Sequence, residues 1–367
     1  MFDKSFTLGK VAGIPIKIHF SFLIILPFLA WAFGSNLQHF AELGEINEGK
    51  LSLNAYFLGL ILAILLFVSV GLHELTHSLV ARKKGMEIDS ITLMLMGGVA
   101  QMEEISKVPE DEIWMAASGP IFSLSLGVIL IIISRFFSAI PDLYFLVFYL
   151  GQINIVLGIF NLIPAFPTDG GRIMRAFLAR RKTYLEATKI AVNVGKGFAF
   201  FFGIIGLITA NFLLVFVAFF IFIGASQEYY DSFFKETLSG LKVKDLMTAD
   251  VSTVSGDLNL TQLLDKMFAE RHSGYPVVDN GRLRGCVTME DIKKVSNKEH
   301  PTKKVKQIMS TDIKKVNPDD DIYHALKLLS AENIGRLMVV QDNELVGIIT
   351  RTDIIKGFQL QEIRKKI

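Results

Sequence analysis

The chain has 367 residues, of which 51% are hydrophobic, and its formal net charge is only +2. This near-neutral charge gives no basis for nucleic-acid binding. The single cysteine, Cys286, excludes an intrachain disulfide framework and a multi-cysteine zinc site. Apolar residues are concentrated before about Tyr230, and the remainder has the composition of a soluble protein. We therefore expect a membrane part followed by a soluble part, with no nucleic-acid partner.

Six predominantly apolar segments are candidates for membrane-spanning helices in a lipid bilayer. They cover approximately residues 18–33, 55–81, 113–136, 143–163, 185–207 and 212–224. Ala30-Trp31-Ala32 has the form of a signal-peptidase site, but the bulky Phe33 after it favours a retained first span. The sequence thus predicts a polytopic α-helical membrane domain of about six transmembrane helices over residues 1–226.

Basic residues predict the orientation of these spans. Lysines precede the first span, a basic cluster follows the second at residues 82–84, and five basic residues follow the fourth, whereas the loop after the first span is acidic. Basic loops remain on the cytoplasmic side of a membrane. We therefore expect both termini to be cytoplasmic.

A metal-binding pattern, His73-Glu74-Leu75-Thr76-His77, lies near the end of the second apolar segment. Histidines four residues apart share one face of a helix, so both imidazoles can reach one metal ion. Glu74 can face the same ion without binding it and take a proton from an activated water molecule. This is the H-E-x-x-H arrangement of zinc hydrolases. A chance match normally falls on a solvated helix, whereas ionisable groups within an apolar span indicate a function.

The fourth apolar segment ends in Pro164-Ala165-Phe166-Pro167 and then Asp169-Gly-Gly, which breaks the helix. By the predicted orientation, Asp169 lies at the same depth as His77. Its carboxylate would complete a His₂Asp set with one position left for water, the open coordination of a catalytic zinc site. The alternative is that Asp169 caps the short helix that follows. We expect one zinc ion per chain, because two histidines alone leave the coordination incomplete.

Between the second and third spans, residues 87–103 are apolar but too short and too rich in glycine for another span. The Gly97-Gly98 pair and the alternation around it predict a re-entrant β-hairpin beside the metal site. The alternative is a loop lying at the membrane surface.

From residue 241 the chain repeats itself without a gap, after a polar linker at residues 227–240. We expect an α/β tandem of two modules, residues 241–300 and 301–367. In each copy a helix opens at Thr-x-x-Asp, at Thr288 and Asp291 and again at Thr350 and Asp353. A hydroxyl and a carboxylate at a helix N-terminus suit a ribose and its phosphate. They equally suit a plain helix cap, and local sequence leaves both readings open.

Together these features resemble the site-2 protease family, and more narrowly its archaeal and bacterial members with a C-terminal pair of CBS domains. The resemblance rests on the histidine motif within a span, on Asn161 and the Asp-Gly-Gly at residues 169–171, and on the hairpin at Gly97-Gly98. It covers essentially the whole chain. Thr168 stands where the family usually has leucine, and no PDZ insertion is evident.

The resemblance implies an intramembrane zinc metalloprotease that hydrolyses peptide bonds within or next to transmembrane segments of other proteins. It also implies that the protein lies in the plasma membrane of a bacterium or archaeon. The implied zinc ligands are His73, His77 and Asp169, the implied general base is Glu74, and Asn161 would steady the oxyanion or the substrate backbone.

The resemblance also implies how substrate and regulators bind. The hairpin would hold the substrate as an added strand, through Met94, Leu95, Met96, Gly97, Gly98 and Val99. The CBS pair would bind adenine nucleotide, AMP or ATP, at Thr288, Asp291, Thr350 and Asp353, and would modulate proteolysis. CBS pairs often associate, so a homodimer is expected.

A CBS-regulated ion transporter or channel is the alternative, because paired CBS domains also follow the membrane domains of chloride and magnesium transporters. His73, Glu74, His77 and Asp169 would then line an ion path. The membrane part shows no internal repeat, which many transporter folds have. The complete set of zinc ligands favours the protease.

Overall fold

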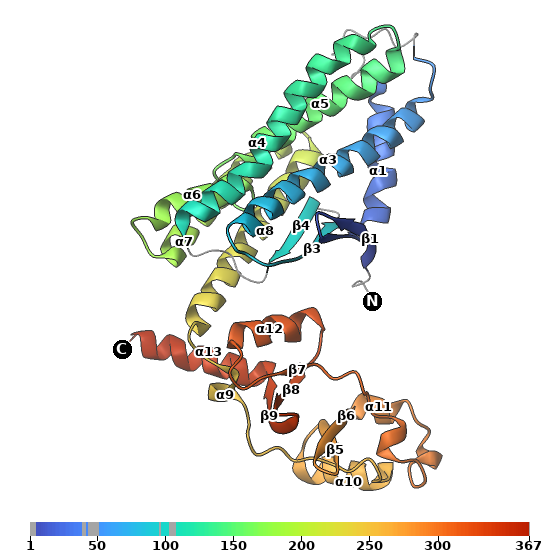
Figure 1. The fold of residues 1–367 in the computed structure, drawn as a ribbon, viewed down its shortest axis with the longest axis vertical. Helices are drawn as coiled ribbons and strands as arrows, with labels where there is room; N and C mark the ends of the chain where they lie inside the picture. Colours follow the sequence, from blue (N-terminus) through green and yellow to red (C-terminus); the bar gives the residue numbers. More distant parts are fainter. Residues whose placement is uncertain (1–4, 39–41, 43–50, 95–96, 103–107, 367) are drawn as a thin grey trace. The chain divides into compact units, whose positions relative to one another are not determined.

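The computed structural model describes residues 5–38, 42, 51–94, 97–102 and 108–366 (Figure 1). The chain divides into two compact units, Met1–Tyr230 and Asp231–Ile367. The first unit consists of apolar helices and one small sheet, and the second is an α/β unit.

Seven helices make up most of the described part of the first unit. They are α1 (Phe22–Ser35), α3 (Ala55–Lys83), α4 (Pro109–Ser134), α5 (Pro141–Asn161), α6 (Asp169–Ala179), α7 (Tyr184–Ile208) and α8 (Phe212–Leu238). Among the described residues, five helices are long and apolar enough to cross a membrane: α3, α4 with the turn after it, α5, α7 and most of α8.

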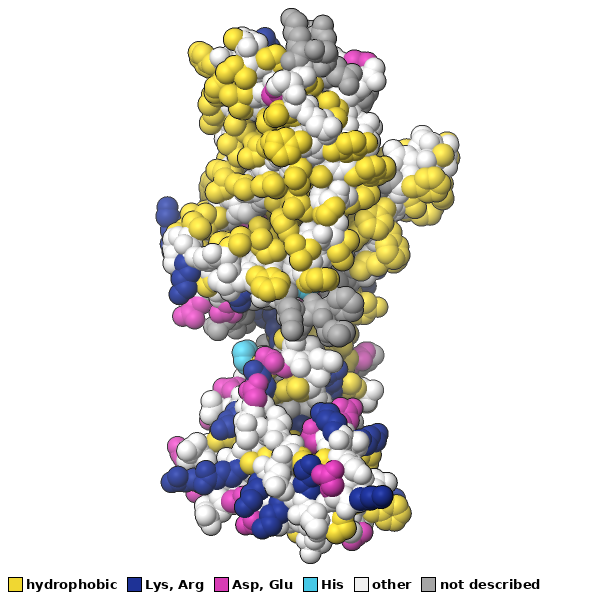
Figure 2. All heavy atoms as spheres, turned by 90° about the vertical axis from the view of Figure 1, so that its right-hand side faces the viewer, with side chains coloured by type: hydrophobic (Ala, Val, Ile, Leu, Met, Phe, Trp, Pro, Cys, Tyr) yellow, Lys and Arg dark blue, Asp and Glu magenta, His cyan; other side chains and the backbone are white. Residues whose placement is uncertain are grey.

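The surface of these helices is apolar. Val156 is 65% exposed, Phe200 72% and Ile208 78%. Figure 2 shows hydrophobic side chains covering much of one face of this unit. A helix that is hydrophobic on all sides belongs in a core or a membrane. The chain is therefore a multi-pass membrane protein, as the sequence predicts.

The first predicted span differs from the others. Its helix, α1, has 14 residues, fewer than the roughly 20 that cross a bilayer. Residues Ile14–His19 form strand β2, which pairs with β1 (Ser5–Val11) through a tight turn with positive φ at Ala12 and Gly13. The backbone of the start of the predicted span is thus used in a sheet, which leaves less of it for a helix.

The four-stranded sheet has the order β1-β2-β3-β4. Strands β3 (Ile88–Met94) and β4 (Gly97–Met102) are antiparallel, with Met94 opposite Gly97, so the predicted hairpin is confirmed. Of its predicted substrate-contacting residues, Leu95 and Met96 lie outside the described residues. Ile91 and Leu93 pack against Val70 and Leu75 of α3. The sheet thus lies beside α3, the helix that carries the histidine motif (Figure 1).

The second unit contains α9 (Val243–Leu246), α10 (Leu260–Glu270), β5 (Gly274–Asp279), β6 (Arg282–Thr288), α11 (Met289–Lys293), β7 (Lys315–Val316), α12 (Ile322–Ala331), β8 (Arg336–Gln341), β9 (Glu344–Thr350) and α13 (Arg351–Lys366). Strands β5 and β6 form one sheet, and β7, β8 and β9 form the other. The duplicated sequence thus folds as two similar α/β modules.

The two modules exchange their first segments. Val243, at the start of the first repeat, is buried in the core built by the second repeat, whereas Val305 is buried in the core of the first.

Two matching ion clusters hold the exchanged segments. Asp257 binds the ammonium groups of Lys304 and Lys306, and hydrogen bonds from these lysines lower the pKa of Asp257 to about 2. Asp319 likewise binds Lys242 and Lys244.

Candidate metal centre

Helix α3 presents two imidazoles on one buried face. His73 and His77 are one turn apart and only 3% and 6% exposed. Their Nε2 atoms lie 3.1 Å apart, with the rings nearly perpendicular. The two side chains therefore converge on one point, as four-residue spacing on a helix predicts.

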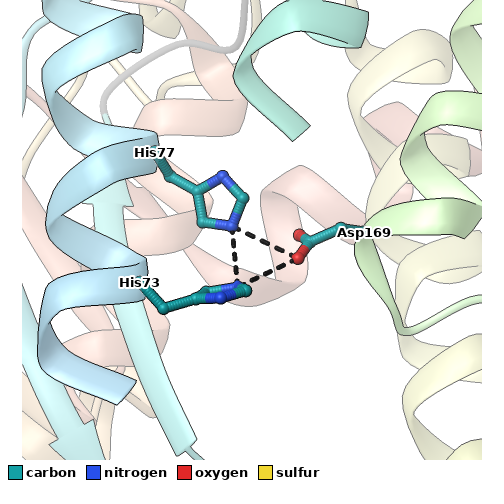
Figure 3. Close-up of side chains that lie close together, drawn as sticks. All are labelled: His73, His77 and Asp169. Carbon is teal, nitrogen blue, oxygen red and sulfur yellow. Dashed lines mark hydrogen bonds and ion pairs between the residues drawn. The ribbon is translucent and has the colours of Figure 1, made fainter. Parts of the chain in front are cut away.

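Asp169 meets the histidines from a different part of the chain. It is the first residue of α6, and its Oδ2 atom lies 3.2 Å from Nε2 of His73 and 3.2 Å from Nε2 of His77 (Figure 3). Thr168, not Asp169, is in the N-cap position of α6. In the described part of the chain, these three residues form the one group of His, Cys, Asp or Glu side chains close enough to hold a metal ion.

Helix α4 fixes the rotation of both rings. Nδ1 of His77 donates a hydrogen bond to the backbone carbonyl of Met115 at 2.7 Å. Nδ1 of His73 lies 2.9 Å from the hydroxyl of Ser123. Such partners behind a ligating imidazole set its tautomer and orientation. With Nδ1 of His77 protonated, Nε2 of the neutral ring carries a lone pair toward the centre of the site.

Gly119 of α4 makes room for the rings. A Cβ atom at this position would lie 2.2 Å from Nε2 of His77 and 2.6 Å from Nε2 of His73. Both contacts are far shorter than any van der Waals separation. A residue larger than glycine would therefore displace the imidazoles.

The chemistry of the donor set suits a cation. Asp169 offers a carboxylate oxygen, and both Nε2 atoms face that oxygen and each other at 3.1–3.2 Å. Lone pairs that converge in this way repel unless a positive charge lies between them. A shared proton can satisfy only one pair, whereas a metal ion satisfies all three groups at once.

The other two predicted catalytic residues differ in their surroundings. Glu74 follows His73 on α3, is half-buried, and interacts electrostatically with all three residues of the centre. Asn161 is the last residue of α5, and its amide donates to the carbonyl of Leu157, one turn back in the same helix, at 3.0 Å. Its side chain is thus held by its own helix.

The Thr-x-x-Asp pairs of the second unit both form helix caps. Thr288 donates from its hydroxyl to Oδ2 of Asp291 at 2.7 Å, and Thr350 does the same to Asp353 at 2.7 Å. The two pairs therefore have the same internal geometry. Thr288 and Asp291 also line a cavity of about 740 Å³.

Residues on α4 were missed in the sequence. Neither Ser123, Gly119 nor the carbonyl of Met115 belongs to the histidine motif, and all three contact the imidazoles. The polar and small residues at 117–119 and at Ser123, within an otherwise apolar span, are the signal that marks this face of α4.

Comparisons with known proteins agree with this division of the chain. The family model for Peptidase family M50 matches residues 61–141 and 138–204, and that for the CBS domain matches residues 243–298 and 305–359. Zinc metalloprotease MJ0392 of Methanocaldococcus jannaschii is 38% identical over 365 residues, which cover 100% of this chain and 99% of the relative.

Two solved structures are also similar to parts of the chain. The site-2 protease from Methanocaldococcus jannaschii is 40% identical, with a TM-score of 0.45, and covers 62% of this chain and 95% of its own. The CBS domain pair of protein MJ0100, in complex with 5′-methylthioadenosine and S-adenosyl-L-methionine, is 26% identical, with a TM-score of 0.30, over 33% of this chain and 98% of its own. Because a zinc metalloprotease is similar over the full length and both family models match, the chain belongs to the site-2 protease family of zinc metalloproteases (Peptidase family M50) and carries a C-terminal pair of CBS domains.

Proposed function

We propose that this protein is an intramembrane zinc metalloendopeptidase that hydrolyses peptide bonds within or next to transmembrane segments of substrate proteins. The observation that carries the proposal is the convergence of His73, His77 and Asp169 at the end of an apolar helix. Buried ionisable groups in such a helix are costly and are retained for function.

The three ligand atoms fit zinc. Ligands at 2.0–2.1 Å from a tetrahedral zinc ion are separated from one another by about 3.3 Å. The separations here are 3.1, 3.2 and 3.2 Å, close to that edge length. Two imidazoles and one carboxylate leave the fourth position for water or substrate, as catalytic zinc sites do. His73, His77 and Asp169 would hold one zinc ion per chain.

In the proposed mechanism, the residues of the chain move the protons and hold the peptide. Zinc, when bound, polarises a carbonyl and lowers the pKa of a water molecule. Glu74 takes the proton of the attacking water and gives it to the leaving amine. Asn161 would turn its amide from its own helix toward the oxyanion or the substrate backbone.

Strand β4 offers a place for the substrate backbone. It lies at the edge of the sheet order β1-β2-β3-β4 among the described strands. An edge strand has backbone groups that can pair with an added strand. A substrate unwound from its helix would pair along Gly97, Gly98 and Val99, and Met94, Leu95 and Met96 are proposed as further substrate contacts. Added as a strand, the substrate exposes the carbonyls that a helix keeps hydrogen-bonded.

The direct test is proteolysis by purified protein. Zinc-loaded protein in detergent is incubated with a panel of single-span membrane proteins, and the products are mapped by mass spectrometry. We expect cuts within or next to the apolar segments, loss of cutting with a chelator, and recovery with zinc. Cuts confined to soluble loops, or unaffected by chelation, would contradict the proposal.

Replacing Gly119 with alanine tests the shape of the centre. The added Cβ would lie 2.2 Å from Nε2 of His77, so we expect zinc binding and proteolysis to fall by at least about tenfold. The control is Gly197→Ala in α7, where a Cβ meets nothing within 4 Å. Zinc content and cleavage are measured for both. Equal zinc binding by the Gly119 variant and the wild type would contradict the geometry.

The CBS pair is proposed to bind AMP or ATP, chiefly at Thr288 and Asp291. The cavity beside them is also lined by Lys293, Lys314 and Arg336, cations suited to phosphate. In the gapless repeat, Ile355, Ser252 and Gly274 align with these three cations. Because the aligned positions carry no charge, we expect the site at Thr350 and Asp353 to bind nucleotide more weakly.

Calorimetry of the full-length protein with AMP and ATP tests this difference. We expect Asp291→Ala to weaken binding at the tighter site by about tenfold or more, since a ribose hydroxyl bonded to a carboxylate contributes roughly 1.5–3 kcal/mol. Asp353→Ala, in the geometrically matched pair, leaves that affinity unchanged. Equal losses in both variants, or no heat in the wild type, would contradict the assignment.

The proposed location is the plasma membrane of a bacterium or archaeon, with both termini cytoplasmic. The basic end of α3, at Arg82 and Lys83, lies within two turns of His77, so water would reach the centre from the cytoplasm.

A homodimer through the CBS domains is proposed as well, supported by exposed apolar side chains on α13 at Ile355, Leu360 and Ile363.

A further inference from the structure

A fully buried arginine lies on α6, the helix that begins at the third ligand of the centre. The side chain of Arg175 is 1% exposed. Its Nε donates to Oε1 of Glu112 at 2.8 Å, its Nη2 donates to the same oxygen, and its Nη1 donates to Oε1 of Glu228 at 2.5 Å. Its Cζ lies 4.8 Å from the ring centroid of Phe166 and 4.7 Å from that of Tyr184.

This ion cluster joins three helices. Arg175 comes from α6, Glu112 from α4 and Glu228 from α8. Removing such charges from water is costly, and apolar side chains of similar volume are often equally stabilising. Stability alone therefore does not account for the cluster. A buried ion cluster can instead fix the register between the elements that carry it.

The two helices joined by Arg175 and Glu112 are the ones that position the proposed metal ligands: α6 carries Asp169, and α4 orients the two imidazoles. Glu112 lies three residues before Met115, whose carbonyl accepts the hydrogen bond from His77. The same helix carries Ser123, the partner of His73. Helix α4 thus orients both imidazoles, and the bond from Arg175 to Glu112 ties α6 to that helix.

The start of α6 is rigidly attached to the rest of the helix and to the loop before it. A Cβ at Gly170 would lie 2.2 Å from the carbonyl oxygen of Ile163, and one at Gly171 would lie 2.5 Å from the backbone nitrogen of Phe166. The loop and the first turn of α6 are therefore packed backbone against backbone. A shift of Arg175 would carry Asp169 with it.

We propose that Arg175 is a positioning residue for the metal centre: its ion pairs with Glu112 and Glu228 hold α6 at the register that brings Asp169 to His73 and His77. The inference rests on the proposed zinc site. Glu228 also connects the cluster to α8.

The test replaces Arg175 together with both of its carboxylate partners, so that neither Glu112 nor Glu228 is left buried without the charge of Arg175. In the triple variant Arg175→Met, Glu112→Leu and Glu228→Leu, we expect the metal-free protein to unfold at the wild-type temperature or above it. Zinc affinity, measured by competition with a chelator, is expected to fall about tenfold. The visible spectrum of the Co²⁺-loaded protein should change, because it reports ligand geometry rather than stability.

The chain offers a matched control. Arg180, at the end of α6, pairs with Glu110 of α4 at 3.0 Å, but both side chains are exposed. Arg180→Met therefore removes an ion pair between the same two helices without touching the buried cluster. We expect wild-type zinc affinity and an unchanged Co²⁺ spectrum, since exposed ion pairs contribute little.

The outcomes separate the two proposals. A folded triple variant with wild-type zinc affinity and Co²⁺ spectrum overturns the role of Arg175. If the triple variant does not fold, Arg175→Lys decides: one ammonium cannot reproduce the planar fork, so zinc affinity should fall by about threefold or more, and an unchanged affinity overturns the role. A wild-type protein that binds no zinc overturns the proposed function itself.

Discussion

Replacing Glu74 with glutamine is expected to reduce the cleavage rate by about 10²–10⁴-fold, which is the usual contribution of general acid–base catalysis. Zinc is expected to stay bound. Glutamine keeps the size of the side chain but cannot accept the proton of the attacking water. Glu74 is not one of the three converging ligands, so its loss leaves the proposed coordination intact. Initial cleavage rates and zinc content are measured on the same samples.

A suitable control for this variant is Glu110→Gln, which removes an exposed carboxylate of α4 in an ion pair with Arg180. It should cleave at the wild-type rate. Cleavage by the Glu74 variant at that same rate would remove Glu74 from the mechanism. Loss of zinc from the Glu74 variant would show that the residue serves the metal rather than the proton transfer.

Removal of the proposed third ligand is expected to have the largest effect on zinc binding. Asp169→Ala takes away the carboxylate that lies 3.2 Å from both Nε2 atoms. We expect zinc affinity to fall by more than the roughly 10–100-fold that is lost with a hydrogen-bond partner behind a ligand, and cleavage to be lost with it. Affinity is measured by competition with a chelator at fixed free zinc.

The matched control for this variant is Asp142→Ala, another aspartate in the first turn of a helix of the membrane unit. Its carboxylate binds the backbone of Ser52 and Leu53 instead of the histidines. It should keep wild-type zinc affinity. A shared loss in both variants would point to unfolding, and wild-type affinity after loss of Asp169 would remove it from the ligand set.

The sequence predicted those parts of the site that depend on local spacing. His73 and His77 share a helical face because they are four residues apart, and the structure brings them together. Asp169 is 96 residues from His73, and it was predicted from the helix-breaking residues around it and the incomplete ligand set. The structure brings it to the same point, through a loop packed tightly on α6.

Contacts between distant charged residues were not predicted. In the sequence, Arg175 is one of several basic residues at the end of a span, and nothing local distinguishes it from the exposed Arg180. Its partners are 63 and 53 residues away. Only the packing of α4, α6 and α8 determines which arginine is buried.

The same limit applies to the sheet and to the CBS modules. The run from Ile14 to Phe33 is apolar throughout most of its length, and apolar content does not distinguish strand β2 from the start of a helix. The repeat identified two copies of one unit. It did not indicate that Val243 packs with the second copy and Val305 with the first, because both copies have the same apolar pattern.

The most direct test of the account is X-ray absorption at the zinc edge, on the wild-type protein and on Asp169→Ala. For the wild type we predict one zinc ion per chain, with two imidazoles and oxygen ligands at about 2.0–2.1 Å and no sulfur. For the variant we predict little bound zinc and a changed ligand shell. Equal zinc content and identical spectra in the two proteins would contradict the claim that His73, His77 and Asp169 bind one metal ion together.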